Sequence, residues 1–336
     1  MNVERAILPV QELELMHHYT ATTCFSMTDK VIQYPIWQVN IPRHAIKHPF
    51  LMRGLLALAA LHLHERSTPT SEKRQTYVDI ASFHQDIALG DYTQQLFNIN
   101  QTNSDALFAY SAVLGSTSFA FLRHTAHDLY GDDFITKMIE SFQLLNGAKA
   151  VAIQGKQWIK QGDLAAMTVR PDSQHLVSSQ LGRDASASLD SLLTHVNNHA
   201  YTTSPEILAA SQSNEGLPDL SAIYASAIEG VKKIFLCATN DRPDISMVIG
   251  WPVLIHPQYH MLLKQGDQMA LIILAQFGAA LHCLNEVWWA QGLGAQLVKA
   301  VSQVIDAEWL PYLNWPVSWT SIDHRYHSPG LGDVTM

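Results

Sequence analysis

Apolar residues along this 336-residue chain recur mainly at intervals of three and four positions, which is the spacing of one face of an α-helix. The strict alternation of a half-buried β-strand is scarce. The pattern therefore predicts an all-α fold, a large single helical domain of about ten or more packed helices. Prolines interrupt residues 31–48, so short helices or turns are expected there. The expected helices span residues 10–27, 50–64, 71–99, 104–121, 131–160, 184–199, 219–238, 256–265, 267–289 and 293–307, with a closing segment at 310–319.

The distribution of loop-forming residues indicates how the domain is organised. Gly, Pro, Ser and Asn gather in the middle of the chain and again near its end. We expect an all-helical domain over residues 1–322, followed by a loose polar tail at 323–336. Within the domain, an N-terminal half (1–160) is joined through a loop-rich middle (161–218) to a C-terminal half (219–322) that holds a ligand pocket.

The composition favours burial and disfavours nucleic-acid binding. Hydrophobic residues make up 47% of the chain and charged residues only 15%, against a usual charged share of about 25%. Some apolar surface is therefore expected to meet a ligand, a partner or a second copy, so a homodimer is possible. The net charge is −9, and the basic residues are scattered. Direct nucleic-acid binding needs clustered cations, so we expect none.

The cysteines and the N-terminus indicate an intracellular protein, cytoplasmic or nuclear. Cys24, Cys237 and Cys283 are odd in number and far apart, which argues against a disulfide framework. The first residues carry charges and no apolar core of a signal peptide. The most apolar run, 269–284, is short for a membrane span, so it predicts a buried core helix and no membrane span.

Large aromatic residues concentrate in the C-terminal half. Their flat rings can form rigid apolar walls around a ligand, although core packing is the alternative for each of them. The sequence predicts a pocket for an apolar small molecule in this region. The expected ligand-binding residues are Trp251, Phe277, Trp288, Trp289 and Trp315.

Three polar residues lie within strongly apolar helices and are candidates to face such a pocket. Gln276 and His282 belong to the predicted helix 267–289. Arg53 lies in 50–64, which is apolar nearly all round and is therefore expected to be central. A buried arginine needs a partner, either a carboxylate of the chain or an oxygen of a ligand. The catalytic residues, if the protein has any, are unknown; these three are the candidates.

No motif for a metal or cofactor is present. His256 and His260 share one helix face, as zinc ligands do, but a third ligand at fixed spacing is missing. Gly292-Leu-Gly294 follows a predicted helix, whereas a nucleotide-binding loop follows a strand. The chain also lacks a G-x-S-x-G nucleophile elbow. We therefore expect no metal and no cofactor.

Several short segments together resemble the regulatory domain of fungal zinc-cluster transcription factors, with the sterol-uptake-control subgroup the most similar. They occur in the same order and touch both ends of the chain. The segments are residues 14–20 (ELMHHYT), 48–63 (HPFLMRGLLALAALHL), 83–89 (FHQDIAL), 103–108 (NSDALF), 288–292 (WWAQG) and 314–316 (NWP).

This resemblance implies an all-α effector domain whose C-terminal half binds a sterol in an apolar pocket. The family's DNA-binding head needs six closely spaced cysteines around two zinc ions. Three dispersed cysteines cannot build that cluster. Either the sequence lacks a head that the protein once carried, or the protein never had one. Because the family-like segments begin within about 15 residues of Met1, we expect the second.

Two functions follow from these observations. The first is binding of an apolar terpenoid- or sterol-like molecule in a helical pocket, without intrinsic DNA binding. The alternative is a cofactor-independent cyclase or pericyclase of fungal secondary metabolism, for example a Diels-Alderase that acts on terpenoid or polyketide-terpenoid substrates. Such a pocket would catalyse by holding a reactive substrate in its attack geometry, which needs no metal, cofactor or catalytic motif.

Overall fold

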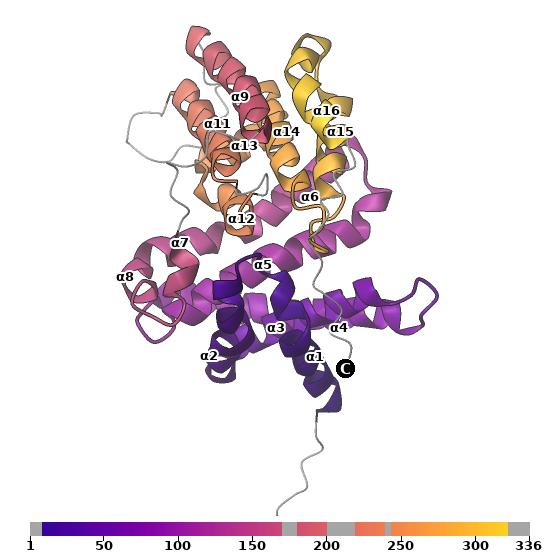
Figure 1. The fold of residues 1–336 in the computed structure, drawn as a ribbon, viewed down its shortest axis with the longest axis vertical. Coiled ribbons are helices and arrows are strands. Elements are labelled where there is room, and N and C mark those ends of the chain that lie inside the picture. Colours follow the sequence, from indigo (N-terminus) through magenta and orange to yellow (C-terminus); the bar gives the residue numbers. More distant parts are fainter. Residues whose placement is uncertain (1–8, 170–179, 200–218, 239–242, 322–336) are drawn as a thin grey trace, which may run out of the picture.

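The computed structural model describes residues 9–169, 180–199, 219–238 and 243–321, and within these ranges it contains helices and no strand (Figure 1). The predicted all-α fold is therefore confirmed. The expected tail and much of the expected loop-rich middle lie outside the described residues. The α-helices are α1 (Val10–Ala21), α2 (Ile41–Lys47), α3 (Pro49–Arg66), α4 (Lys73–Gln95), α5 (Ser104–Thr125), α6 (Gly131–Leu144), α7 (Asn146–Gln154), α8 (Lys156–Ile159), α9 (Gln180–Asn198), α11 (Leu220–Leu236), α12 (Ile245–Leu254), α13 (Pro257–Lys264), α14 (Gln268–His282), α15 (Leu293–Val304) and α16 (Asn314–Thr320).

Short helical turns connect several of these helices. One of them, η3, is a π-helical turn and the others are 3₁₀ turns. They are η1 (Thr23–Ser26), η2 (Val31–Gln33), η3 (Ile36–Asn40), η4 (Leu96–Asn98), η5 (Ala126–Asp128), η6 (Ala165–Thr168) and η8 (Ala307–Leu313).

The N-terminal half is built around α3, which packs against α1, α2, α4 and α5. Pro49 occupies the first helical position, where its missing N–H breaks no hydrogen bond. From Gly54 to His62 every residue of α3 is buried, because the helix is apolar nearly all round. At Gly54 the ring of Tyr110 on α5 comes so close that a β-carbon would lie 2.7 Å from it. The small residue thus lets α5 cross tightly over α3.

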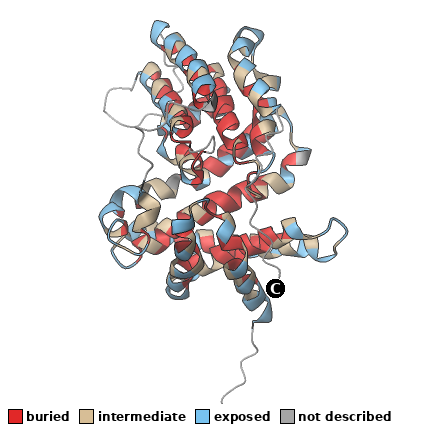
Figure 2. Ribbon diagram, in the orientation of Figure 1, coloured by how far each residue is buried: buried red, intermediate tan, exposed pale blue. Residues whose placement is uncertain are grey.

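The C-terminal half is built around α14, and every residue from Met269 to His282 is buried (Figure 2). Helices α11, α13, α15 and α16 pack against α14, and α9 packs against α11 (Figure 1). Asp267 begins α14 by accepting a hydrogen bond from the backbone N–H of Ala270, 2.8 Å away. The prediction of a buried core helix in the 269–284 run is confirmed.

Three predicted boundaries differ from the structure. The expected helix 131–160 is divided into α6, α7 and α8, with breaks at Leu145 and Gly155. The expected helix 267–289 ends at His282, and a looped turn follows in which Asn285 accepts a hydrogen bond from Gly292 N–H (2.7 Å). A ten-residue helix, α12, forms between the expected helices 219–238 and 256–265, where no helix was expected; Pro252 lies near its C-terminal end.

One described helix, α5, is long and apolar enough to cross a membrane. However, 78% of its most apolar stretch is buried inside the protein. It contacts α2, α3, α6 and α7, which is the position of a core helix.

Candidate functional site

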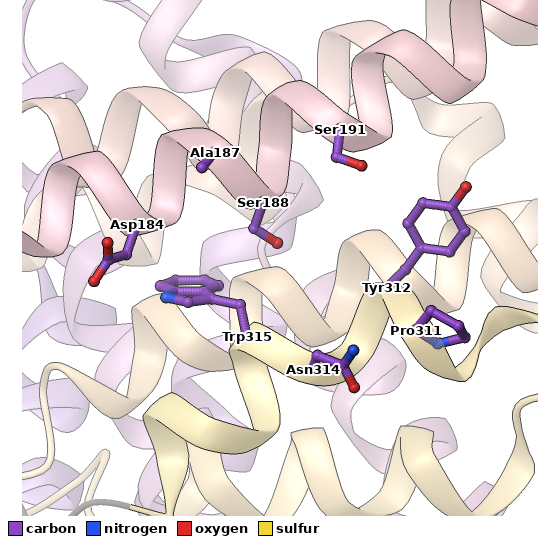
Figure 3. A pocket seen from close by; sticks show the side chains of 8 residues that line it. All are labelled: Asp184, Ala187, Ser188, Ser191, Pro311, Tyr312, Asn314 and Trp315. Atoms are coloured by element: carbon purple, nitrogen blue, oxygen red, sulfur yellow. The ribbon is translucent and has the colours of Figure 1, made fainter.

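A surface cleft of about 340 Å³ lies between α9 and the η8–α16 segment (Figure 3). This volume falls at the lower end of the roughly 300–1,000 Å³ that is usual for small-molecule sites. We call it the Trp315 cleft. Its lining residues are Asp184, Ala187, Ser188, Ser191, Pro311, Tyr312, Asn314 and Trp315.

The sequence of α9 explains how one side of the Trp315 cleft forms. The apolar residues Ala185, Leu189, Leu192 and Val196 are fully buried, and α9 packs against α11. The helix face beside this stripe carries small and polar residues spaced three or four positions apart, and these line the cleft. Short side chains such as Ser188 leave room that a longer side chain would fill.

Gln276 lies directly beneath the Trp315 cleft and joins its two walls to α14. Its side-chain amide N–H donates to Ser188 Oγ at 3.1 Å and to the backbone carbonyl of Tyr312 at 3.2 Å. Gln276 is fully buried. Because a buried amide without partners is costly, these bonds fix the positions of both walls. The sequence predicted Gln276 as an inward-facing polar residue; in the structure it is buried behind Ser188 and Tyr312, which line the cleft, and does not line the cleft itself.

The aromatic wall of the cleft comes from η8 and α16. Trp315 is half-buried and packs edge-on against Phe235 of α11, with ring centroids 5.4 Å apart. The hydroxyl of Tyr312 lies 2.8 Å from Nδ1 of His195. Burial, followed by the neighbouring His199, lowers the pKa of His195, so this imidazole is neutral at pH 7. The cleft therefore combines an apolar ring with uncharged polar groups and the exposed carboxylate of Asp184.

Three of the predicted ligand-binding aromatics belong to a buried cluster of rings in the core. Trp251 and Phe277 stack with centroids 4.5 Å apart and planes at 15°. Phe277 also meets Phe142 edge-on at 5.6 Å. The cluster continues through Phe119 to Trp289, whose stacked centroids are 6.2 Å apart. Trp251, Phe277 and Trp289 are buried, so they support the fold beneath the Trp315 cleft and do not line it.

Trp288 lies apart from that cluster and fastens the N-terminal segment to the C-terminal half. Its ring stacks on His62 of α3 with centroids 4.8 Å apart, and its indole N–H donates to Ser26 Oγ at 2.8 Å. His62 Nδ1 lies 2.9 Å from Thr23 Oγ1. Burial, with smaller contributions from the nearby His18 and Arg66, lowers the pKa of His62 to about 4.

Acid should loosen this contact. Folded His62 binds its proton more weakly than the unfolded side chain does. The stabilisation that this residue contributes is therefore fully present above about pH 6.5 and is lost as the pH falls towards 4. The loss from this residue should reach at most about 3 kcal/mol. Urea unfolding between pH 4 and 7 measures it. The His62→Asn variant should show a shallower pH dependence, and an unchanged slope would contradict the assignment to His62.

The other two polar candidates lie away from the Trp315 cleft. Arg53 is in the N-terminal half, where Nη1 lies 3.3 Å from Nδ1 of His84 and the guanidinium stands over the ring of Phe83. His282 ends α14 beside Gly294 of α15. The structure therefore brings Gln276 and Trp315 to one site and separates Arg53, His282 and Trp288 from it.

The described part of the chain contains no group of three His, Cys, Asp or Glu residues placed to hold a metal ion. His256 begins α13, where its Nδ1 accepts the backbone N–H of Gln258 at 3.2 Å. His260 is buried and faces the ring of Phe142. Burial lowers the pKa of both histidines.

Two relatives match the chain along nearly its whole length. A Zn(2)-C6 fungal-type transcription factor of Gibberella zeae is 27% identical over 324 residues, which cover 93% of this chain. Sterol uptake control protein 2 of Candida albicans is 24% identical over 323 residues, which cover 89% of it. The homologues of this chain are fungal Zn(2)-C6 transcription factors. No family model matches the chain.

The chain corresponds to only part of these transcription factors. It spans 62% of the length of the Gibberella zeae protein and 41% of the Candida albicans protein. The resemblance seen in the sequence is thus confirmed at the level of homology to this group. Within the matched length, the fold is the helical domain described above.

Sequence reasoning missed most residues of the Trp315 cleft. Ser188 lies in an expected helix and Asn314 in one of the family-like segments, but Ser188, Tyr312 and Asn314 carried no sequence signal of a binding role. One signal was available: Ser188 and Ser191 share a face of α9 beside its apolar stripe. A stripe of small hydroxyl side chains is also typical of a solvated helix, so it does not by itself predict a binding site.

Proposed function

We propose that this protein is a regulatory domain of the Zn(2)-C6 transcription-factor type and that it binds a terpenoid- or sterol-like molecule in the Trp315 cleft. Homology to fungal transcription factors fits a regulatory role, and one of the two relatives is named for control of sterol uptake. The observation that carries the proposal is the juxtaposition of the half-buried Trp315 ring with Ser188, which bonds to the buried Gln276.

The chemistry of the cleft supports a ligand with an apolar body and a hydroxyl group. Trp315 offers a flat apolar surface, while the Ser188 and Ser191 hydroxyls and the Asn314 amide offer hydrogen-bond partners. The cleft is open to solvent on one side, so a ligand can enter without unfolding of α9. Gln276 holds α9 and η8 at a fixed separation, which reduces the ordering cost of binding.

We also propose that residues 1–336 alone do not bind DNA and that the protein acts inside the cell, in the nucleus or cytoplasm. The chain contains three cysteines, which cannot form a six-cysteine zinc cluster, and its net charge is −9. Dimerisation stays a prediction. The cyclase alternative also stays a prediction, since the names of the two relatives do not support it.

Replacing Trp315 with alanine should weaken ligand binding roughly tenfold or more, because a central aromatic side chain carries much of the binding energy in such sites. Titration of the protein with a naturally fluorescent sterol, and separately with a fluorescent sesquiterpenoid, measures this affinity. The melting temperature should change little, since Trp315 is only half-buried.

The matched control is Trp288→Ala. It removes the same side chain from a half-buried position, but at the contact with His62 and Ser26, away from the cleft. It should leave ligand affinity unchanged at pH 7. Equal weakening by both variants would contradict the assignment to the Trp315 cleft, and the absence of binding to either probe would contradict the ligand class.

A further inference from the structure

A basic segment interrupts this acidic chain. Between Ser141 and Gly162 the sequence contains three lysines, Lys149, Lys156 and Lys160, and no aspartate or glutamate. The whole chain carries 30 acidic residues against 21 basic ones. This segment forms the end of α6, α7 and the short α8, at the left of Figure 1.

An open cleft of about 460 Å³ lies on the surface of this segment, lined by Ile153, Gln154, Lys156, Gln157 and Lys160. We call it the lysine cleft. All of its lining residues are exposed, and 64% of the Ile153 surface is accessible to solvent. The cleft thus offers two ammonium groups, two amides and one apolar side chain.

The core holds this surface in place. Val151 and Ile159 are buried, and α8 packs against α5. Gly155 joins α7 to α8 so tightly that a β-carbon would lie 2.7 Å from the carbonyl oxygen of Val151. The lining side chains therefore project from a backbone that is fixed from below.

The acidic residues that flank this segment in the sequence, and Asp105 of the neighbouring helix α5, are directed elsewhere. Glu140 pairs with Lys137 at 2.8 Å. Asp105 of α5 and Asp163 both face His44, with closest oxygen-to-Nε2 distances of 3.7 and 3.4 Å. Within the described ranges, neither Lys156 nor Lys160 forms an ion pair with a carboxylate of this chain. Their charges are available to a partner.

We propose that the lysine cleft docks a short acidic segment of a partner protein, with an apolar residue of that segment seated against Ile153. Charge complementarity selects such a partner, because lysine ammonium and glutamine amide groups are donors and carboxylates are acceptors. A nucleic acid fits less well, because binding a long row of phosphates needs many clustered cations, and this cleft offers two in a chain whose net charge is −9. No aromatic side chain lines this cleft, so a small apolar ligand would find no flat wall of the kind that Trp315 offers.

Binding of a fluorescein-labelled peptide of Glu-Glu-Leu repeats, followed by fluorescence anisotropy, tests this proposal. The full chain should bind it, and added salt should weaken binding because exposed charges are screened. The double variant Lys156→Glu/Lys160→Glu should weaken it roughly tenfold, since two attractions become repulsions. A peptide of Gln-Gln-Leu repeats should not bind.

The matched control is Lys73→Glu, which reverses the charge of an exposed lysine at the start of α4. This position is far from the lysine cleft, because α7 contacts η4, which follows the opposite end of α4. It should leave peptide binding unchanged. The proposal is overturned if the acidic peptide does not bind, if Lys73→Glu weakens binding as much as the double variant, or if single-stranded DNA binds the lysine cleft as tightly as the peptide. Sterol binding by the double variant should equal that of the unmodified protein, so this test is independent of the Trp315 cleft.

Discussion

Gly294→Ala should destabilise the protein by about 3 kcal/mol, near the upper limit for an added methyl group in a packed core. A β-carbon at Gly294 would lie 2.5 Å from the carbonyl oxygen of Gly278 and 2.6 Å from Cα of His282. Both are backbone atoms of α14, so no side-chain rotation can relieve the overlap. The two helices would have to separate, and α14 carries Gln276, which holds the Trp315 cleft.

Urea unfolding at neutral pH measures this change. Gly90→Ala is the matched control, because Gly90 lies within α4 and a β-carbon there meets no atom within 4 Å. That substitution should stabilise the protein by about 0.5–1 kcal/mol through helix propensity alone. If Gly294→Ala were as well tolerated as Gly90→Ala, α14 and α15 would not cross as closely as the structure shows.

The sequence predicted the helical fold well because long apolar helices carry a strong local signal. The segment 50–64 became α3 with ends displaced by one or two residues, and the apolar run near Gln276 became the buried helix α14. The breaks at Leu145 and Gly155 were missed. A glycine lowers helix propensity only slightly, and the packing of α8 on α5 decides the break, which no local pattern reveals.

The site was predicted only in part, because a cleft depends on how distant segments meet. Gln276 stood out as a polar residue within an apolar helix, and its hydrogen bonds reach two residues that line the cleft, Ser188 and Tyr312. Arg53 stood out for the same reason, yet α3 is in the other half of the protein. Sequence spacing places residues on a helix face, but it does not state which helix that face meets. Ser188 and Tyr312 lie together because α9 meets the η8–α16 segment, and the spacing of residues along either segment does not reveal that contact.

Phe277→Ala should lower the free energy of unfolding by about 3–5 kcal/mol, the usual cost of removing a buried phenylalanine ring. Phe277 is fully buried and touches Trp251 and Phe142. Its removal leaves a cavity and two rings without their partner. A domain is typically stable by only about 5–15 kcal/mol, so this variant should melt at a much lower temperature.

A measurement of ligand affinity distinguishes a binding role of Phe277 from a structural one. The sequence predicts it as a ligand-binding residue, whereas its position in the ring cluster predicts a structural one. Phe277→Leu keeps most of the volume and should cost about 1.5 kcal/mol or less, so it stays folded and its sterol affinity can be measured. We expect that affinity to match the unmodified protein. A fall of tenfold in Phe277→Leu, with little change in melting temperature, would place the ligand against this ring, and the Trp315 cleft would then be only the entrance to a deeper site.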